Sequence, residues 1–288
     1  MYPLLIASIL CASMNSILLH RVRLSSAAAV YRLNLIASLV WLVCLFSLNG
    51  FRLSLSRAVI LFALIYGITQ AAFILFKSLA MNRGPVSVTA LFGNGSLLLS
   101  VAVCYFAFDE AVTIWDVIGL IALLAAIVMT TYKRGDGRGE APKRGWLTCA
   151  FLFLILGAGV GISFKAFGKS GAGDSAGDMM CIAAAIMALL YLPLYLTARK
   201  KEGGKGADPD RRFIPIAIAS GLLACCYNRL NITLSGALDA IIFFPFFNGG
   251  VIILTTVCSV IFTKEGLRPT QVAGILLGTA AIAVIGIF

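Results

Sequence analysis

The sequence predicts an all-α membrane protein with ten transmembrane helices, arranged as two five-helix repeats of inverted topology. Three observations lead to this prediction: an apolar composition, long apolar runs and an internal repeat. Of the 288 residues, 60% are hydrophobic and 12% are charged, and the mean hydropathy is +0.99. A water-soluble chain of this length needs many more polar residues to cover its surface. A soluble enzyme is therefore excluded.

The apolar residues fall into ten long runs, and each run is long enough for a membrane-spanning helix. A helix of about 20 residues crosses roughly 30 Å of hydrocarbon, whereas a transmembrane β-barrel would show shorter, alternating strands. The predicted spans are residues 3–20, 26–48, 57–81, 86–108, 112–132, 144–165, 175–198, 212–235, 238–262 and 268–288. The connections are short, so no extramembrane domain is expected.

The chain also repeats itself. Residues 84–133 align without gaps to residues 239–288, and an acidic residue with a glycine nine positions later recurs at the same boundary between two spans. The matched pairs are Glu110 with Glu265 and Gly119 with Gly274. We interpret both glutamates as helix-start and turn residues, because a carboxylate there accepts hydrogen bonds from backbone N–H groups.

Each half of the chain therefore holds five predicted spans. An odd number of crossings makes the second half enter the membrane from the opposite side, which gives an inverted-topology pair. We expect the first repeat at residues 1–135, a basic connecting loop at 136–143 and the second repeat at 144–288. Such pairs allow one fold to open alternately to either side of the membrane.

The net charge of +11 is concentrated in two connections. One holds Lys133, Arg134, Arg138, Lys143 and Arg144, and the other holds Arg199, Lys200, Lys201, Lys205, Arg211 and Arg212. Basic clusters beside apolar spans are typical of the cytoplasmic side, where anionic lipid headgroups are the expected partner. No nucleic-acid partner is expected. With ten spans, the charge count places both termini outside a cell membrane, and the bacterial inner membrane is the expected location.

Four cations lie within predicted spans, each close to a span end: Arg32, Lys77, Lys165 and Arg229. A long basic side chain near a helix end can reach the headgroups, which is one interpretation. The other is a cavity whose unpaired cations favour anionic or zwitterionic solutes. Lys77 and Arg229 fall late in the third span of their halves, as a two-fold related site requires.

Neutral polar residues extend this candidate substrate site: Asn94, Asn248, Gln70 and Asn228. Asn94 and Asn248 occupy equivalent depths in glycine-rich stretches of two spans. Close helix packing and contact with a solute both explain such residues, as do interhelical hydrogen bonds. The eight cysteines lie within predicted spans and the chain has one histidine, so neither a metal site nor another cofactor is expected.

Several segments resemble the drug/metabolite transporter superfamily, in particular its ten-helix EamA-type permeases. They are Thr263-Lys264-Glu265-Gly266-Leu267 with Gln271 and Gly274, the echo of this junction at Asp109-Glu110 with Gly119, Asn228-Arg229-Leu230-Asn231, Ser235-Gly236, and Phe243-Phe244-Pro245 followed by Asn248-Gly249-Gly250. The resemblance implies solute transport by alternating access. The first span lacks the membrane-embedded glutamate of the small multidrug branch, and many relatives begin inside the cell.

The sequence thus predicts a secondary transporter for a small anionic or zwitterionic metabolite, such as an amino acid, and no enzyme. One alternative is an exporter of hydrophobic or cationic compounds, which would bind mainly through aromatic side chains. Another is a lipid scramblase or scaffold. The substrate, the coupling ion, the direction of flux and the oligomeric state stay open.

Overall fold

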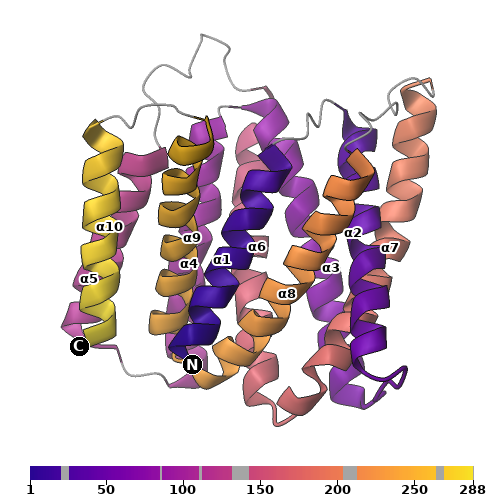
Figure 1. Ribbon diagram of the computed structural model, residues 1–288, viewed down its shortest axis with the longest axis horizontal. Coiled ribbons are helices and arrows are strands. Elements are labelled where there is room, and N and C mark those ends of the chain that lie inside the picture. The colour runs from indigo at the N-terminus through magenta and orange to yellow at the C-terminus, as the bar shows by residue number, and fades with distance from the viewer. Residues whose placement is uncertain are drawn as a thin grey trace. The chain divides into compact units, whose positions relative to one another are not determined.

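The computed structural model describes residues 1–20, 26–84, 86–109, 112–131, 143–203, 213–263 and 269–287. Within these ranges the chain forms ten α-helices and one short 3₁₀ helix, and no strand (Figure 1). The elements are α1 (Tyr2–His20), α2 (Ala27–Leu48), α3 (Arg57–Arg83), α4 (Val86–Phe108), α5 (Ile114–Thr131), α6 (Trp146–Lys169), η1 (Gly173–Ser175), α7 (Ala176–Lys201), α8 (Phe213–Ala237), α9 (Ala240–Thr263) and α10 (Pro269–Ile287). The all-helical prediction is confirmed.

Polar residues define where several of these helices begin. The Ser26 side chain accepts a hydrogen bond from Ala29 N at the start of α2. At the start of α5, Thr113 Oγ1 accepts from Asp116 N, and Asp116 Oδ2 accepts from Thr113 N at 2.8 Å. These contacts occupy N–H groups that the first helical turn leaves without partners.

Within the described residues, seven helices are long and apolar enough to cross a membrane: α1, α2, α3, α6, α7, α8 and α9. The apolar stretches in α4, α5 and α10 are shorter, at 10–17 residues. A helix that crosses the bilayer satisfies all of its backbone hydrogen bonds internally, which the hydrocarbon interior requires. The chain is therefore a multi-pass membrane protein.

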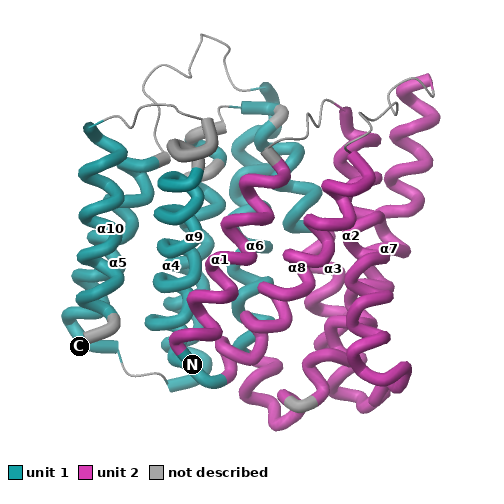
Figure 2. Tube along the Cα trace, in the orientation of Figure 1, with its two compact units in different colours: residues 1, 72–165, 237–288 teal, residues 2–71, 166–236 magenta. Residues whose placement is uncertain are grey.

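The chain divides into two compact units (Figure 2). Unit 1 contains Met1, Ala72–Lys165 and Ala237–Phe288, and unit 2 contains Tyr2–Ala71 and Ala166–Gly236. Each unit thus draws helices from both halves of the sequence.

In unit 1, α5 packs along α10, and α4 packs against α9. A Cβ atom added to Gly119 of α5 would lie 2.5 Å from Ile285 Cγ1 of α10, and one added to Gly274 of α10 would lie 2.8 Å from Thr130 Cγ2 of α5. The two helices are therefore antiparallel. When residues 84–133 are aligned with 239–288, Gly119 corresponds to Gly274 and Thr130 to Ile285. Replacing each residue of the first contact by its counterpart in the other half therefore gives the second contact.

Helix α6 of unit 1 approaches α4 and α9 closely through two glycines, one turn apart. A Cβ atom on Gly157 would lie 3.0 Å from Ser96, and one on Gly161 would lie 2.7 Å from the Phe244 ring. Ser100 Oγ of α4 also donates to the Ala158 carbonyl of α6 at 3.5 Å. Small residues allow helix backbones to approach in a membrane, where dispersion contacts and hydrogen bonds replace the hydrophobic effect.

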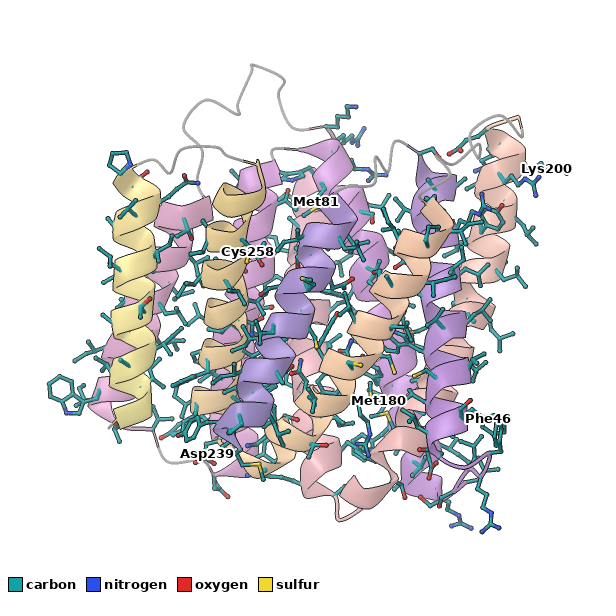
Figure 3. All side chains as sticks on the ribbon, in the orientation of Figure 1. Phe46, Met81, Met180, Lys200, Asp239 and Cys258 are labelled. Atoms are coloured by element: carbon teal, nitrogen blue, oxygen red, sulfur yellow. The ribbon has the colours of Figure 1, made fainter. Side chains whose placement is uncertain are left out.

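In unit 2, α2 packs along α7 in the antiparallel sense. At one end Asn49 Nδ2 donates to Asp178 Oδ1 at 2.7 Å, and at the other end Ala28 N donates to Glu202 Oε1 at 3.3 Å. Figure 3 shows Lys200 and Phe46 at opposite ends of this pair. The basic end of α7 and the connection after α2 therefore lie at opposite ends of this antiparallel pair.

Part of the predicted charge pattern lies outside the described residues. Of the two basic connections, the structure describes Lys143, Arg144 and the cations that end α7, residues 199–201. The other members are not among the described residues: Lys133, Arg134, Arg138, Lys205, Arg211 and Arg212. The same is true of Glu110 and Glu265, so their predicted helix-start role stays a prediction.

Candidate functional site

A row of polar side chains joins α1 to α8 inside unit 2. Ser8 Oγ donates to Asn231 Oδ1 at 2.6 Å and is 3.3 Å from the Tyr227 carbonyl oxygen. Two turns along α1, Asn15 Oδ1 accepts a hydrogen bond of 2.6 Å from Ser220 Oγ. All four of these side chains are buried. Buried polar groups in apolar surroundings need such partners, so the row holds the two helices in one register.

Tyr227 extends this row along α8. Its hydroxyl group lies beside the side chains of Asn228 and Asn15. The Asn228 amide also donates to the Ala224 carbonyl of its own helix at 2.8 Å. The predicted site residue Asn228 therefore belongs to a polar network with Asn15, which sequence analysis had not connected to it.

Gln70 of α3 is another buried amide of unit 2. Its side chain is 9% exposed, and its Oε1 atom accepts no hydrogen bond within the described part of the chain. A buried amide oxygen without a partner costs about 1–3 kcal/mol relative to a satisfied one. A ligand that donates a hydrogen bond would remove this cost, so Gln70 keeps its place as a candidate binding residue.

Lys165 is the most deeply buried cation of the described residues. Its side chain is 1% exposed, and its ammonium group donates to the Leu238 carbonyl, between α8 and α9 in unit 1. Helix α6 continues for one more turn beyond this residue, to Lys169. The ammonium group of Lys165 therefore lies inside the protein, at the connection between two helices, and its predicted role in binding a solute stays a prediction.

The other three predicted cations have different surroundings. Lys77 is exposed on α3 in unit 1. In unit 2, the Arg32 guanidinium carbon lies 5.3 Å from the centroid of the Phe213 ring, a cation–π contact where α8 begins. Arg229 is partly exposed, and its Nη1 atom lies 3.5 Å from Thr233 Oγ1 of the same helix. Lys77 and Arg229 thus belong to different units, and their predicted pairing as a charge site stays a prediction.

The two predicted asparagines of the glycine-rich stretches both lie in unit 1. Asn94 of α4 and Asn248 of α9 are partly buried. Asn248 Nδ2 donates to the Phe244 carbonyl of its own helix at 2.9 Å, which leaves its Oδ1 atom available as an acceptor. Because α4 and α9 pack together, both amides belong to one helix pair.

The eight predicted site residues thus divide evenly between the units. Unit 1 holds Lys77, Asn94, Lys165 and Asn248, and unit 2 holds Arg32, Gln70, Asn228 and Arg229. Sequence analysis missed Ser8 and Ser220. The spacing of Ser220, Tyr227 and Asn231, at intervals of seven and four residues, is the signal that identifies a polar face on α8.

Comparison with known proteins informs the fold and not the activity. No protein-family model matches the chain, and no curated protein matches it. In contrast, 28 chains of solved structures match it. One of them, described as the crystal structure of a protein, aligns with a TM-score of 0.75 at 17% identity and covers 98% of this chain and 94% of its own. The ten-helix fold thus recurs in a solved protein over nearly its full length.

Proposed function

We propose that this membrane protein is a secondary transporter that moves a small anionic or zwitterionic metabolite by alternating access. In this proposal its two five-helix halves form an inverted repeat, as in the EamA-type permeases of the drug/metabolite transporter superfamily. The observation that carries the proposal is the reciprocal contact between α5 and α10, in which Gly119 meets Ile285 and Gly274 meets Thr130.

This contact supports an inverted repeat for a geometric reason. If a two-fold axis in the membrane plane relates two halves, a helix next to the axis packs against its own counterpart in the antiparallel sense. Helices α5 and α10 are such counterparts. The pairs α2 with α7 and α4 with α9 also join helices at the same position in each half. Inverted repeats provide two states of similar free energy that open to opposite sides.

Lys165 supports the class of substrate. An ionisable side chain buried within a membrane helix is costly to keep, and it usually marks a substrate or ion pathway. A cation favours a solute that carries a carboxylate or a phosphate, and it disfavours an organic cation. The partly buried Asn248, which belongs to the same unit as Lys165, adds hydrogen-bonding capacity for a polar solute.

A ligand screen on the purified protein tests the proposal. The protein in detergent is heated with amino acids, phosphorylated metabolites, nucleosides and organic cations, each in separate samples. A ligand at 100 times its Kd stabilises the folded state by about 2.7 kcal/mol, which raises the melting temperature. We expect stabilisation by an anionic or zwitterionic compound, and counterflow of that compound in proteoliposomes.

Lys165→Met then tests the role of the charge. This variant keeps an unbranched side chain of similar length, and we expect it to lose both the stabilisation and the counterflow. Lys169→Met is the matched control, because Lys169 lies one turn further along α6 and is exposed. Selective stabilisation by organic cations would favour the alternative exporter. Lipid exchange between leaflets without solute flux would favour a scramblase.

A further inference from the structure

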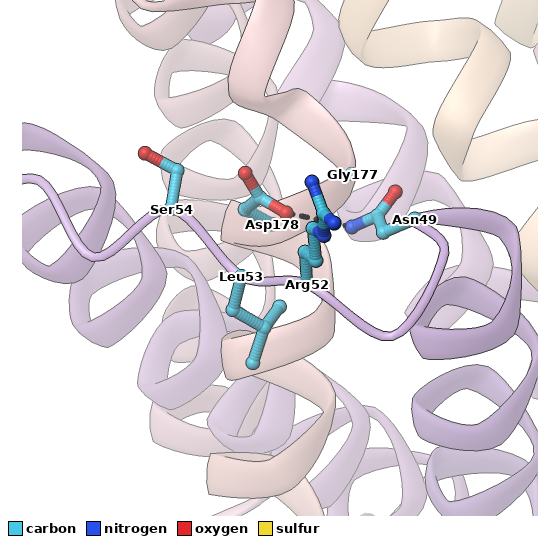
Figure 4. A pocket seen from close by; sticks show the side chains of 6 residues that line it. All are labelled: Asn49, Arg52, Leu53, Ser54, Gly177 and Asp178. Carbon is cyan, nitrogen blue, oxygen red and sulfur yellow. Dashed lines mark hydrogen bonds between the residues drawn. The ribbon is translucent and has the colours of Figure 1, made fainter.

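A pocket lies at one end of unit 2, where the connection between α2 and α3 meets the start of α7. Its volume is about 410 Å³. The lining residues are Asn49, Arg52, Leu53, Ser54, Gly177 and Asp178 (Figure 4). It contains none of the residues proposed above for transport.

The pocket presents two opposite charges that do not neutralise each other. Asp178 Oδ1 accepts the hydrogen bond from Asn49 Nδ2, while its Oδ2 atom accepts none from the described residues. The exposed Arg52 side chain forms no ion pair within the described part of the chain. Figure 4 shows both side chains at the same pocket. A ligand with an anionic and a cationic group can therefore contact both.

The backbone of the connection is held in a defined conformation. Gly50 and Phe51 have φ angles of 62° and 60°, a left-handed conformation that is rare for phenylalanine. Phe51 N donates to the Phe46 carbonyl at 3.0 Å, and the two phenylalanine rings are 5.4 Å apart. A Cβ atom on Gly177 would lie 2.6 Å from Asn49 Oδ1, so a larger residue here would displace the Asn49 side chain. The backbone that carries Arg52 and the carboxylate of Asp178 are thus in place before a ligand binds, while the exposed Arg52 side chain is free to adjust.

The position of the pocket indicates a lipid as the ligand. It lies at the ends of three helices that are long and apolar enough to cross a membrane, α2, α3 and α7. The side chains of Leu48, Phe51 and Leu55 in and beside the connection are 75%, 68% and 66% exposed. Apolar groups at a helix end insert at the boundary of headgroups and acyl chains. The pocket beside them would therefore lie next to the headgroups of bilayer lipids.

We propose that this pocket binds the headgroup of a phosphatidylethanolamine-type lipid, with its phosphate beside Arg52 and its ammonium group on Asp178. The guanidinium group is suited to phosphate, since its N–H donors match the phosphate oxygens. A primary ammonium group donates hydrogen bonds to a carboxylate, whereas the quaternary ammonium group of phosphatidylcholine has no N–H to donate. The pocket therefore prefers phosphatidylethanolamine to phosphatidylcholine.

Lipid titration of the full chain tests this inference. Delipidated protein in detergent is titrated with dioleoyl phosphatidylethanolamine, phosphatidylcholine or phosphatidylglycerol, and bound lipid is counted by native mass spectrometry. We expect phosphatidylethanolamine to bind about tenfold more tightly than phosphatidylcholine, because it forms one additional charge-assisted hydrogen bond. A separate titration with soluble phosphoethanolamine tests whether the headgroup alone is the ligand. We expect it to bind more weakly than the lipid.

Three variants localise the effect. Asp178→Asn keeps an oxygen that accepts from Asn49, and it should abolish the preference for phosphatidylethanolamine. Arg52→Gln changes an exposed side chain and should weaken binding of both zwitterionic lipids. Arg57→Gln is the control, because Arg57 is exposed on α3 but does not line the pocket. Equal affinities for the lipids, an unchanged preference in Asp178→Asn, or equally tight binding of soluble phosphoethanolamine would each overturn the inference. A failed transport assay would not affect it.

Discussion

At the scale of residues, unit 2 depends on side-chain hydrogen bonds between apolar helices. A hydroxyl buried in hydrocarbon loses its water and needs an acceptor, either a carbonyl of its own helix or a group on a neighbouring helix. Ser8 finds one in Asn231, and Ser220 finds one in Asn15. The pairs thus fix how α1 lies along α8, a choice that apolar side chains alone specify weakly.

A double-mutant cycle on Ser8 and Asn231 measures this contribution. We expect a coupling energy of roughly 0.6 kcal/mol, and no more than about 1.7, because polar contacts between membrane helices have values in that range. The measurement is unfolding of Ser8→Ala, Asn231→Ala and the double variant in mixed micelles. Ser47→Ala is the control, since Ser47 is exposed and donates only to the Val43 carbonyl of its own helix. Additive effects of the two alanine variants would contradict the expectation.

At the scale of elements, two glycines let α6 and α8 cross in close contact. A Cβ atom on Gly236 would lie 2.9 Å from the Cα atom of Gly168, a backbone atom that cannot move aside without moving its helix. We expect Gly236→Ala to lower the free energy of unfolding by about 1–3 kcal/mol, the range for overpacked sites. The measurement is thermal or chemical unfolding in detergent.

Gly173→Ala provides the matched control for this crossing. Gly173 has only the Gly168 carbonyl oxygen near its Cβ position, at 3.8 Å, which is an ordinary contact distance. We expect this variant to change the stability by less than about 0.5 kcal/mol. If both alanine variants had the same small effect, α6 and α8 would not be in close contact at Gly236.

The start of α5 is stabilised by reciprocal capping hydrogen bonds between Thr113 and Asp116. The acid accepts from both the backbone N and the hydroxyl of Thr113, at 2.8 Å each. We expect Thr113→Ala to lower the free energy of unfolding by about 0.5–2 kcal/mol, and Thr113→Ser to restore most of the loss, because serine keeps the hydroxyl. Equal losses in the two variants, measured by unfolding in detergent, would show that the methyl group matters instead of the hydroxyl.

At the scale of the whole molecule, hydropathy predicts where the helices lie in the sequence better than it predicts which helices pack together. Observed helix ends differ from the predicted span ends by a few residues, because the bilayer thickness sets the length of each apolar run. The largest shift is at α6, where the predicted span ends at Lys165 and the helix ends at Lys169. A lysine counts against a span, so hydropathy placed this residue at a boundary and missed its burial.

Helix pairing was beyond the reach of the sequence for a physical reason. Lipid chains and core side chains are equally apolar, so the apolar runs do not distinguish a lipid-facing side from a packed side. The packing of α2 along α7, with Asn49 on Asp178 at one end, became visible only in the structure. The glycines were the useful signal, because Gly119 and Gly274 were identified from the repeat and do lie at a helix contact.

The antiparallel pair of α2 and α7 leads to a prediction about the two sides of the membrane. Because the pair is tied at both ends, the connection after α2 and the basic end of α7 must face opposite compartments. The positive-inside rule places Arg199, Lys200 and Lys201 in the cytoplasm, so residues 49–56 face outward. In a variant without native cysteines, a membrane-impermeant maleimide should label Ser54→Cys in intact cells and label Lys201→Cys only after permeabilisation.

Lys143→Cys serves as a second cytoplasmic position from the other basic connection. Labelling of Ser54→Cys and Lys201→Cys from the same side would mean that α7 does not cross the membrane against α2, and the inverted arrangement of the halves would fail with it.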